Sequence, residues 1–150
     1  MSSLPPTGRL LALDWGTVRT GVALSDELQI LATPLTALVR RPGKRFPMRR
    51  LLELVEAHQP AGILIGLPLT PEGTEAEAAA GARALAEQLA PLARLPVEFW
   101  DERFSTARAL GAIREVGGST RGRREDVDAL AAAVLLQHFL DSRRPRPADD

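Results

Sequence analysis

One short run of residues constrains the fold more than any other feature of the chain. Positions 63–67 read Ile-Leu-Ile-Gly-Leu and carry no polar side chain. A strand with one face in solvent alternates apolar and polar residues, so a wholly apolar run indicates a strand that is covered on both faces. Such strands belong to parallel sheets with helices on both sides. We therefore expect an α/β domain with this strand near the centre of its sheet.

The segments before this run have the patterning of antiparallel strands. A first apolar segment ends at Asp14, and a Gly-containing turn leads into a second one, which predicts a hairpin. The third segment carries Pro34, which indicates an edge strand or a bulge. The resulting prediction is a mixed five-stranded sheet, with three antiparallel strands first and parallel strands after them, flanked by helices. We expect strands over 10–14, 20–25, 30–39, 63–67 and 96–100, and helices over 48–58, 74–89, about 105–116 and about 126–141.

The chain length predicts a single domain. A chain of 150 residues suits one hydrophobic core, and we find no internal repeat. We expect the domain to span 9–141, after a disordered N-terminus over 1–8. The segment 142–150 is rich in Arg, Pro and Asp and is expected to be a disordered tail.

Composition excludes several chemistries. The chain has no cysteine and only two histidines, so disulfides, cysteine nucleophiles and Cys- or His-rich metal sites are excluded. Any metal would have to be held by oxygen ligands, which favours Mg²⁺ or Mn²⁺. No apolar run is long enough to span a membrane, and the first eight residues do not resemble a signal peptide. These features predict a cytoplasmic protein without a membrane partner.

Basic residues are clustered although the formal net charge is zero. The segment 40–50 has six basic residues and no acidic one, and further arginines cluster at 121–124 and 143–146. The chain has a single lysine, so the arginine excess also fits codon bias in a GC-rich genome. Arginine nevertheless binds phosphate through its forked donors whatever the reason for its use, so local anion-binding patches are expected.

Three acidic positions stand at the ends of apolar elements and are candidate metal ligands. Asp14 ends the first strand, the Asp101-Glu102 pair follows the fifth strand, and Asp128 lies near the start of the last helix. Sites in open α/β sheets gather at the carboxyl ends of strands. Carboxylates that converge there repel one another, and a divalent cation removes that penalty. Two such cations can promote in-line displacement at phosphorus. Each acid alone also has a simpler explanation, as a turn residue, a surface ion pair or a helix-start acid.

Helix and strand geometry separates the neighbouring acids. Asp126 and Asp128 differ by roughly 200° around a helix, so both cannot face one site. We assign Asp128 to the sheet side and Asp126 to the helix dipole. Asp101 and Glu102 point to opposite faces if the strand continues through them, and this pattern leaves the choice between them open. Ala131–Ala133 would let the last helix approach the sheet closely. Its expected inner face comprises Val127, Leu130, Ala131, Val134, Leu135 and His138.

Four motifs, in order, resemble those of the YqgF/RuvX family. They are LDWGTVRTGVALSD at 13–26, IGLPL at 65–69 with EGT at 72–74, DERFST at 101–106 and REDVDALAA at 124–132. The resemblance covers about 9–141 and implies an RNase H-like fold related to RuvC resolvases. It implies a metal-dependent nuclease whose acids map onto Asp14, the Asp101-Glu102 pair and Asp128, and we select Glu102 of the pair. The departures are mild: Arg123 and Arg124 replace frequent lysines, and Phe104 replaces a frequent leucine.

The leading functional hypothesis is a nuclease that cuts nucleic acid, most simply RNA during maturation of the 5′ end of pre-16S rRNA, as the resemblance implies. Asp14, Glu102 and Asp128 would bind Mg²⁺ or Mn²⁺. The phosphates would be held by Arg19, Arg103, Arg121, Arg123 and Arg124. Binding should then weaken steeply with salt. Aromatic residues are only 4% of the chain, which disfavours strong sequence readout by base stacking.

Three alternatives remain open at this point. A Holliday-junction resolvase would use the same acids on branched DNA but needs a dimer, because two symmetric cuts require two sites. The sequence leaves monomer and homodimer both possible. An ATPase of the actin and sugar-kinase type would match the phosphate-loop-like residues 14–17, but those proteins pair two such domains. A non-catalytic nucleic-acid-binding module would not need all three acids.

Overall fold

The computed structural model describes residues 2–67, 79–101 and 124–144, with side chains in the last segment from residue 126 onward. Its strands form one five-stranded sheet in the order β3-β2-β1-β4-β5. The strands are β1 (Leu10–Asp14), β2 (Arg19–Ser25), β3 (Ala32–Val39), β4 (Gly62–Leu67) and β5 (Val97–Asp101). β1, β2 and β3 pair antiparallel, whereas β4 is parallel to both β1 and β5. The mixed sheet predicted from the sequence is confirmed.

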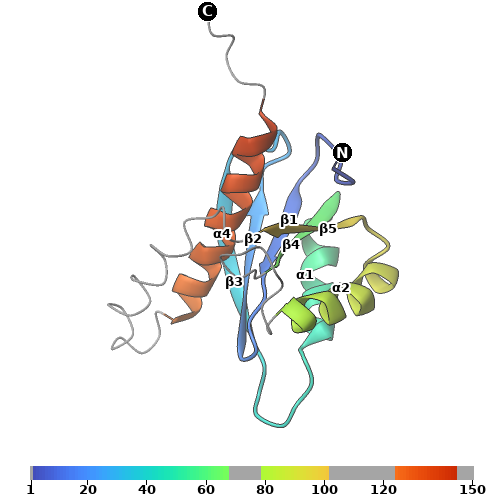
Figure 1. The fold of residues 1–150 in the computed structure, drawn as a ribbon, viewed down its shortest axis with the longest axis vertical. Coiled ribbons are helices and arrows are strands. Elements are labelled where there is room, and N and C mark those ends of the chain that lie inside the picture. The colour runs from blue at the N-terminus through green and yellow to red at the C-terminus, as the bar shows by residue number, and fades with distance from the viewer. Residues whose placement is uncertain (1, 68–78, 102–123, 145–150) are drawn as a thin grey trace, which may run out of the picture.

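Helices cover both faces of this sheet, as Figure 1 shows. α1 (Met48–His58) and α2 (Ala79–Ala93) lie on one face, and α4 (Arg124–Arg143) lies on the other, mainly over β2 and β3. α1 ends where expected, with Gln59 in the left-handed conformation before Pro60. The helix predicted over 105–116 and the predicted start of α2 at 74–78 lie outside the described residues.

The face under α1 and α2 is packed with large aliphatic side chains. Alternate residues of the central strands point into it, among them Leu11, Leu13, Ile63 and Ile65, each fully buried. Burial of each such side chain stabilises the fold by roughly 1.5–3 kcal/mol. Both faces of β4 are buried, as its unbroken apolar run predicts.

The face under α4 is built from smaller side chains. Ala12 and Ala23 of the sheet meet Ala132 and Ala133 of α4 in one buried cluster. Gly21 lies directly under the helix, because a Cβ built on it would overlap the carbonyl oxygen of Asp128. The small residues therefore let α4 approach the sheet closely, as expected from its alanine run.

The inner face of α4 differs from the one predicted. Leu130 is exposed, whereas the buried side is centred on Asp128, Ala132, Leu136 and Phe139. Alanine and leucine occupy every side of this helix, so apolar periodicity alone selects its buried side poorly. The centre of the predicted stripe was therefore wrong by about one position, although Ala131 and Leu135 are buried as predicted. The assignment of Asp128 to the sheet side agrees with its burial.

The residues before β1, expected to be disordered, make specific contacts instead. Leu4 is buried against the α4 face, and Glu98 on β5 accepts hydrogen bonds from Ser2 and Ser3. At the other end α4 continues to Arg143, whose guanidinium donates to the carbonyl oxygen of Leu4. The segment before β1 is short and has only Leu4 as a buried apolar residue, so it has no apolar periodicity from which these contacts could be predicted. The rest of the predicted tail, 145–150, lies outside the described residues.

Two smaller expectations concern the sheet edge and membranes. β3 is an edge strand, and its register with β2 shifts next to Pro34, where Val22 pairs with Thr36 and Ala23 with Pro34. The predicted edge or bulge at this proline is thus confirmed on both counts. Within the described part of the chain, no helix is both long and apolar enough to cross a membrane.

Candidate active site

Asp14 and Asp128 come together on the α4 face of the sheet. Asp14 pairs with Gly21 across the β1–β2 hairpin, and directly opposed residues in antiparallel strands point to the same side. Gly21 in turn contacts the backbone of Asp128, since a Cβ there would lie 2.6 Å from the Asp128 carbonyl carbon. The end of β1 and the first turn of α4 are therefore adjacent, although 114 positions separate them in sequence.

The Asp128 carboxylate is buried beside one guanidinium group. Its side chain is 9% exposed, and Arg19 at the start of β2 donates from Nε to its Oδ2 at 2.6 Å. Arg19, predicted as a phosphate contact, is thus held at the candidate site and keeps about a third of its side chain exposed. Asp126, by contrast, is exposed, in agreement with its assignment to the helix terminus.

The two faces of β5 distinguish Asp101 from its neighbour. Val97 and Phe99 pack toward α1 and α2, whereas Trp100 packs against α4. Alternation along the strand therefore places Asp101 on the α1/α2 face, opposite to Asp14 and Asp128. This removes Asp101 from the shared site and leaves Glu102 as the candidate of the pair.

Several predicted site residues cannot be placed. Glu102, Arg103, Arg121 and Arg123 lie outside the described residues, as does the side chain of Arg124. Among the side chains that are described, no group of three or more acidic or histidine residues could hold a metal ion. The described part of the site is thus a pair of carboxylates. It lies at the end of the sheet where β1 and β5 terminate, and Glu102 directly follows β5 there in the sequence.

The donors of this pair suit a hard divalent cation. Carboxylate oxygens are the ligands that Mg²⁺ and Mn²⁺ prefer. Two acids on a common face, with Glu102 directly after the end of β5, match that preference. Arg19 already places one positive charge beside Asp128, at 2.6 Å from its Oδ2. The chemistry that fits such a site is hydrolysis of a phosphodiester, in which negative charge develops on phosphate oxygens.

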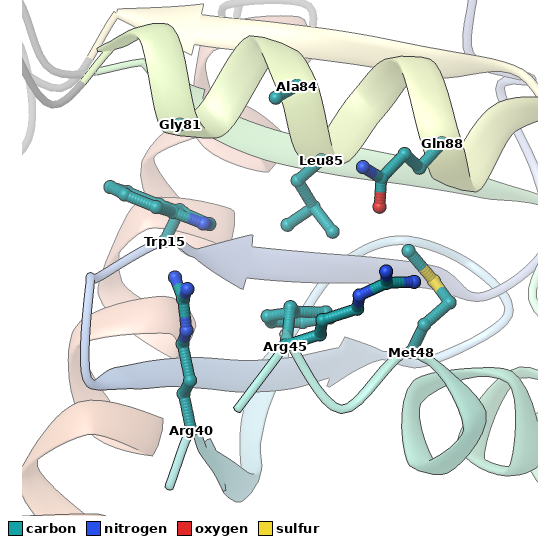
Figure 2. A pocket seen from close by; sticks show the side chains of 9 residues that line it. Trp15, Arg40, Arg45, Met48, Gly81, Ala84, Leu85 and Gln88 are labelled. Carbon is teal, nitrogen blue, oxygen red and sulfur yellow. The ribbon is translucent and has the colours of Figure 1, made fainter. Parts of the chain in front are cut away.

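A cleft on the opposite face was not foreseen as a functional feature. It has a volume of about 560 Å³ and lies between α2 and the segment that leads from β3 into α1. Trp15, which directly follows Asp14, lines it together with Arg40 and Arg45, as Figure 2 shows. The basic run at 40–50 was the one sequence signal for it, but that signal did not indicate which arginines would face the cleft.

The fold is that of an RNase H-like domain, with Asp14 at the end of β1 and Asp128 near the start of α4 on one face of its sheet. A solved structure of RuvC from T. thermophilus, in complex with a Holliday-junction substrate, shares this fold with a TM-score of 0.56. The likeness covers 90% of this chain and 95% of that one at 18% sequence identity, so it bears on the fold alone.

The chain belongs to the RuvX family, because the family model described as Holliday junction resolvase matches residues 8–142. A relative from Rhodobacter capsulatus, named "Putative pre-16S rRNA nuclease", is 42% identical over 140 residues, which are 93% of this chain and 87% of the relative. A relative of the same name from Roseiflexus is 39% identical over 144 residues, which are 96% of this chain and all of that one. The family resemblance read from the four motifs is confirmed.

Proposed function

We propose that this chain is a metal-dependent nuclease that hydrolyses phosphodiester bonds in RNA during maturation of the 5′ end of pre-16S rRNA. The observation that carries the proposal is the contact of Gly21 with Asp128, which brings the last helix against the strand that pairs with Asp14. Two distant acids on one face, in a member of the RuvX family, support a site for phosphodiester cleavage. The names of the curated relatives support pre-16S rRNA as the substrate.

Asp14, Glu102 and Asp128 would hold Mg²⁺ or Mn²⁺. The exclusion of Asp101 from the α4 face supports Glu102 as the third ligand. A cation bound there would supply Lewis-acid activation of water and of the scissile phosphate. The chain's own contribution is to hold the two elements that carry Asp14 and Asp128 against each other, because Gly21 has no Cβ and lets α4 lie directly on β2.

Arg19 would act at two stages. Without metal, its Nε–H donates to Asp128 and neutralises that buried carboxylate. With metal and substrate present, the exposed part of the guanidinium would be available for a phosphate oxygen of the strand. Arg103, Arg121, Arg123 and Arg124 would hold further phosphates, which positions the strand without reading its sequence.

The direct test is cleavage of labelled RNA that carries the 5′ extension of 16S rRNA. We expect cutting with Mg²⁺ or Mn²⁺ and none in EDTA. Asp14→Asn, Glu102→Gln and Asp128→Asn should each lower the rate by at least about a hundredfold, while RNA binding persists, because the change removes charge and keeps shape. Asp101→Asn and Asp126→Asn are the matched controls and should cut normally. Cleavage that continues in EDTA would refute the mechanism.

Cleavage of four-way DNA junctions is the second candidate function, favoured by the description of the matching family model. It would use the same acids but requires two sites related by a twofold axis. Sedimentation of the protein on junction DNA separates the two proposals. A dimer that cuts both strands symmetrically supports resolution, whereas a monomer that cuts only pre-rRNA supports the first proposal.

A further inference from the structure

We infer that the cleft beside Trp15 binds one unpaired nucleotide of the substrate strand, with its base against the indole and its phosphates at Arg40 and Arg45. The inference deepens the proposed function, since it assigns that substrate a second contact on the other face of the sheet. No motif of the family resemblance includes Arg40 or Arg45.

The charge of the cleft favours an anion. In the part of the chain that the structure describes, its lining includes two arginines and no acidic residue. Among the described residues, neither Arg40 nor Arg45 has a carboxylate within ion-pair distance. Two guanidinium groups without a counter-charge attract phosphate, and they bind it through several donors at once.

Arg40 is held in place before any ligand binds. Its backbone N–H donates to the carbonyl oxygen of Val18 at 2.8 Å, and its Nε–H donates to the carbonyl oxygen of Lys44 at 2.7 Å. Because Nε is bonded to Lys44, the terminal nitrogens of Arg40 are free to face the cleft, and Figure 2 shows them pointing toward Trp15. A side chain that is already ordered loses less entropy on binding, which favours a specific contact over a diffuse one.

Trp15 packs against α2 on the opposite side of the cleft. Its six-membered ring lies against Gly81 of α2, where a Cβ would overlap the ring and come within 2.8 Å of Cζ3. The indole is only partly buried, and its remaining surface lines the cleft. A flat aromatic surface next to bound phosphate is the arrangement that stacks an unpaired base. A base inside a duplex is already stacked on its neighbours and could not enter.

The position of the cleft connects it to the acids. Trp15 directly follows Asp14, so one edge of the sheet carries the acidic site on the α4 face and this cleft on the other. A strand crossing that edge would have its scissile phosphate at the acids and a neighbouring nucleotide in the cleft. The cleft would then hold the strand in register for cutting without touching the reacting atoms.

Binding in EDTA tests the inference separately from cleavage. The probe is a fluorescein-labelled single-stranded RNA decamer, followed by anisotropy at low salt. We expect Arg40→Ala and Arg45→Ala each to weaken binding about 3- to 10-fold and to reduce the salt slope by roughly 0.7. Arg49→Ala is the matched control, because it removes the same charge from the same basic segment on a side chain that is 96% exposed on α1. It should change affinity less than twofold.

The stacking contact has its own test. Trp15→Leu should weaken binding of the decamer about 5-fold or more but leave binding of an abasic decamer unchanged. In a Trp100→Phe background, which removes the only other tryptophan, the RNA should quench the remaining emission. A duplex of equal length should quench less. If the substitution weakens normal and abasic strands equally, or if the duplex quenches as well, the inference is wrong.

The outcomes distinguish the two proposals. If the wild-type protein cuts RNA and both arginine variants bind and cut like Arg49→Ala, the cleft has no such role and the nuclease assignment stands. If the wild-type protein cuts nothing with either metal but the arginine variants lose binding, the cleft stands as a nucleic-acid site and the nuclease assignment fails.

Discussion

The two faces of the sheet hold their helices in different ways. On the α4 face, backbone lies against backbone, with Gly21 of β2 under Asp128. On the α1/α2 face, side chains separate the layers, and Gly81 of α2 rests on the ring of Trp15 rather than on a strand. The first face carries the buried Asp128 beside the half-buried Asp14, and the second carries an open cleft with two arginines.

This difference suits the two tasks that we assign to the faces. Metal ligands must keep a fixed geometry, and contact between backbones cannot adjust without moving the whole helix. The cleft is lined largely by side chains, so a change there displaces one side chain and leaves the helix in place. The comparison therefore predicts that equal substitutions on the two faces have unequal effects.

The largest effect is expected for Gly21→Ala. The added methyl group would overlap the Asp128 carbonyl, which cannot move unless α4 lifts from the sheet. We expect a loss of about 3 kcal/mol in the free energy of unfolding, at the upper end of the range for overpacked sites. Chemical denaturation measures it. Any residual folded protein should cut RNA poorly, because the displaced helix carries Asp128. An unfolding midpoint equal to that of the wild type would show that the contact is not close.

Loss of the Arg19 partner should have the next largest effect. Arg19→Met keeps the aliphatic stem but leaves the buried Asp128 carboxylate without this guanidinium. Breaking fully buried pairs costs 3–5 kcal/mol, and because Arg19 is a third exposed we expect about 1–2 kcal/mol. The matched control is Arg49→Met on α1, whose 3.8 Å pair with Glu53 is exposed and should change stability by less than about 0.5 kcal/mol.

Added Mg²⁺ sharpens the same prediction. If Asp128 is a metal ligand, the cation should offset part of the loss in Arg19→Met, and thermal unfolding should shift upward more than in the wild type. Equal shifts in both proteins would indicate that Arg19 and the metal do not share Asp128.

The sequence predicts the sheet and the side of it on which Asp128 lies, but neither the buried side of α4 nor the cleft. The apolar run 63–67 and the hairpin before it fixed the sheet, because strand burial and alternation are local signals. Helix geometry excluded that Asp126 and Asp128 share one site, and the apolar residues beside Asp128 then favoured Asp128. The buried side of α4 was missed because alanine and leucine surround that helix. The cleft could not be foreseen, since it joins Trp15, Gly81 and Arg40 from three distant segments.

Gly81→Ala is the counterpart of Gly21→Ala on the other face. Here the added methyl group meets the Trp15 ring, which can tilt. Alanine also favours the helix by up to about 1 kcal/mol, so we expect a net loss of only about 1 kcal/mol. In a Trp15→Phe background the shorter ring leaves room, and the same substitution should become stabilising. A double-mutant cycle measures this change of sign. A substitution that destabilises both backgrounds equally would mean that the ring is not the obstacle.

The smallest effect concerns the turn that joins β2 to β3 and binds α4. Asp26 accepts hydrogen bonds from the N–H groups of Leu31 and Ile30, and chiefly the bond from Leu31 holds the pKa of Asp26 below its usual value. The side chain of Gln137 on α4 donates to the carbonyl oxygen of Ile30 and accepts from the N–H of Ala32. The turn therefore helps to hold α4 against the sheet.

Because its pKa is lowered in the folded state, ionised Asp26 stabilises the protein above the unfolded-state pKa near 3.8, and this contribution disappears as pH falls through the folded-state value. Asp26→Asn keeps an acceptor oxygen but no charge. We expect it to lower stability at pH 7 by less than about 1 kcal/mol, since the side chain is exposed. At pH 2–3 urea unfolding of the two proteins should converge. A difference that stayed constant with pH would mean that the shape of the Asp26 side chain, and not its charge, matters at this turn.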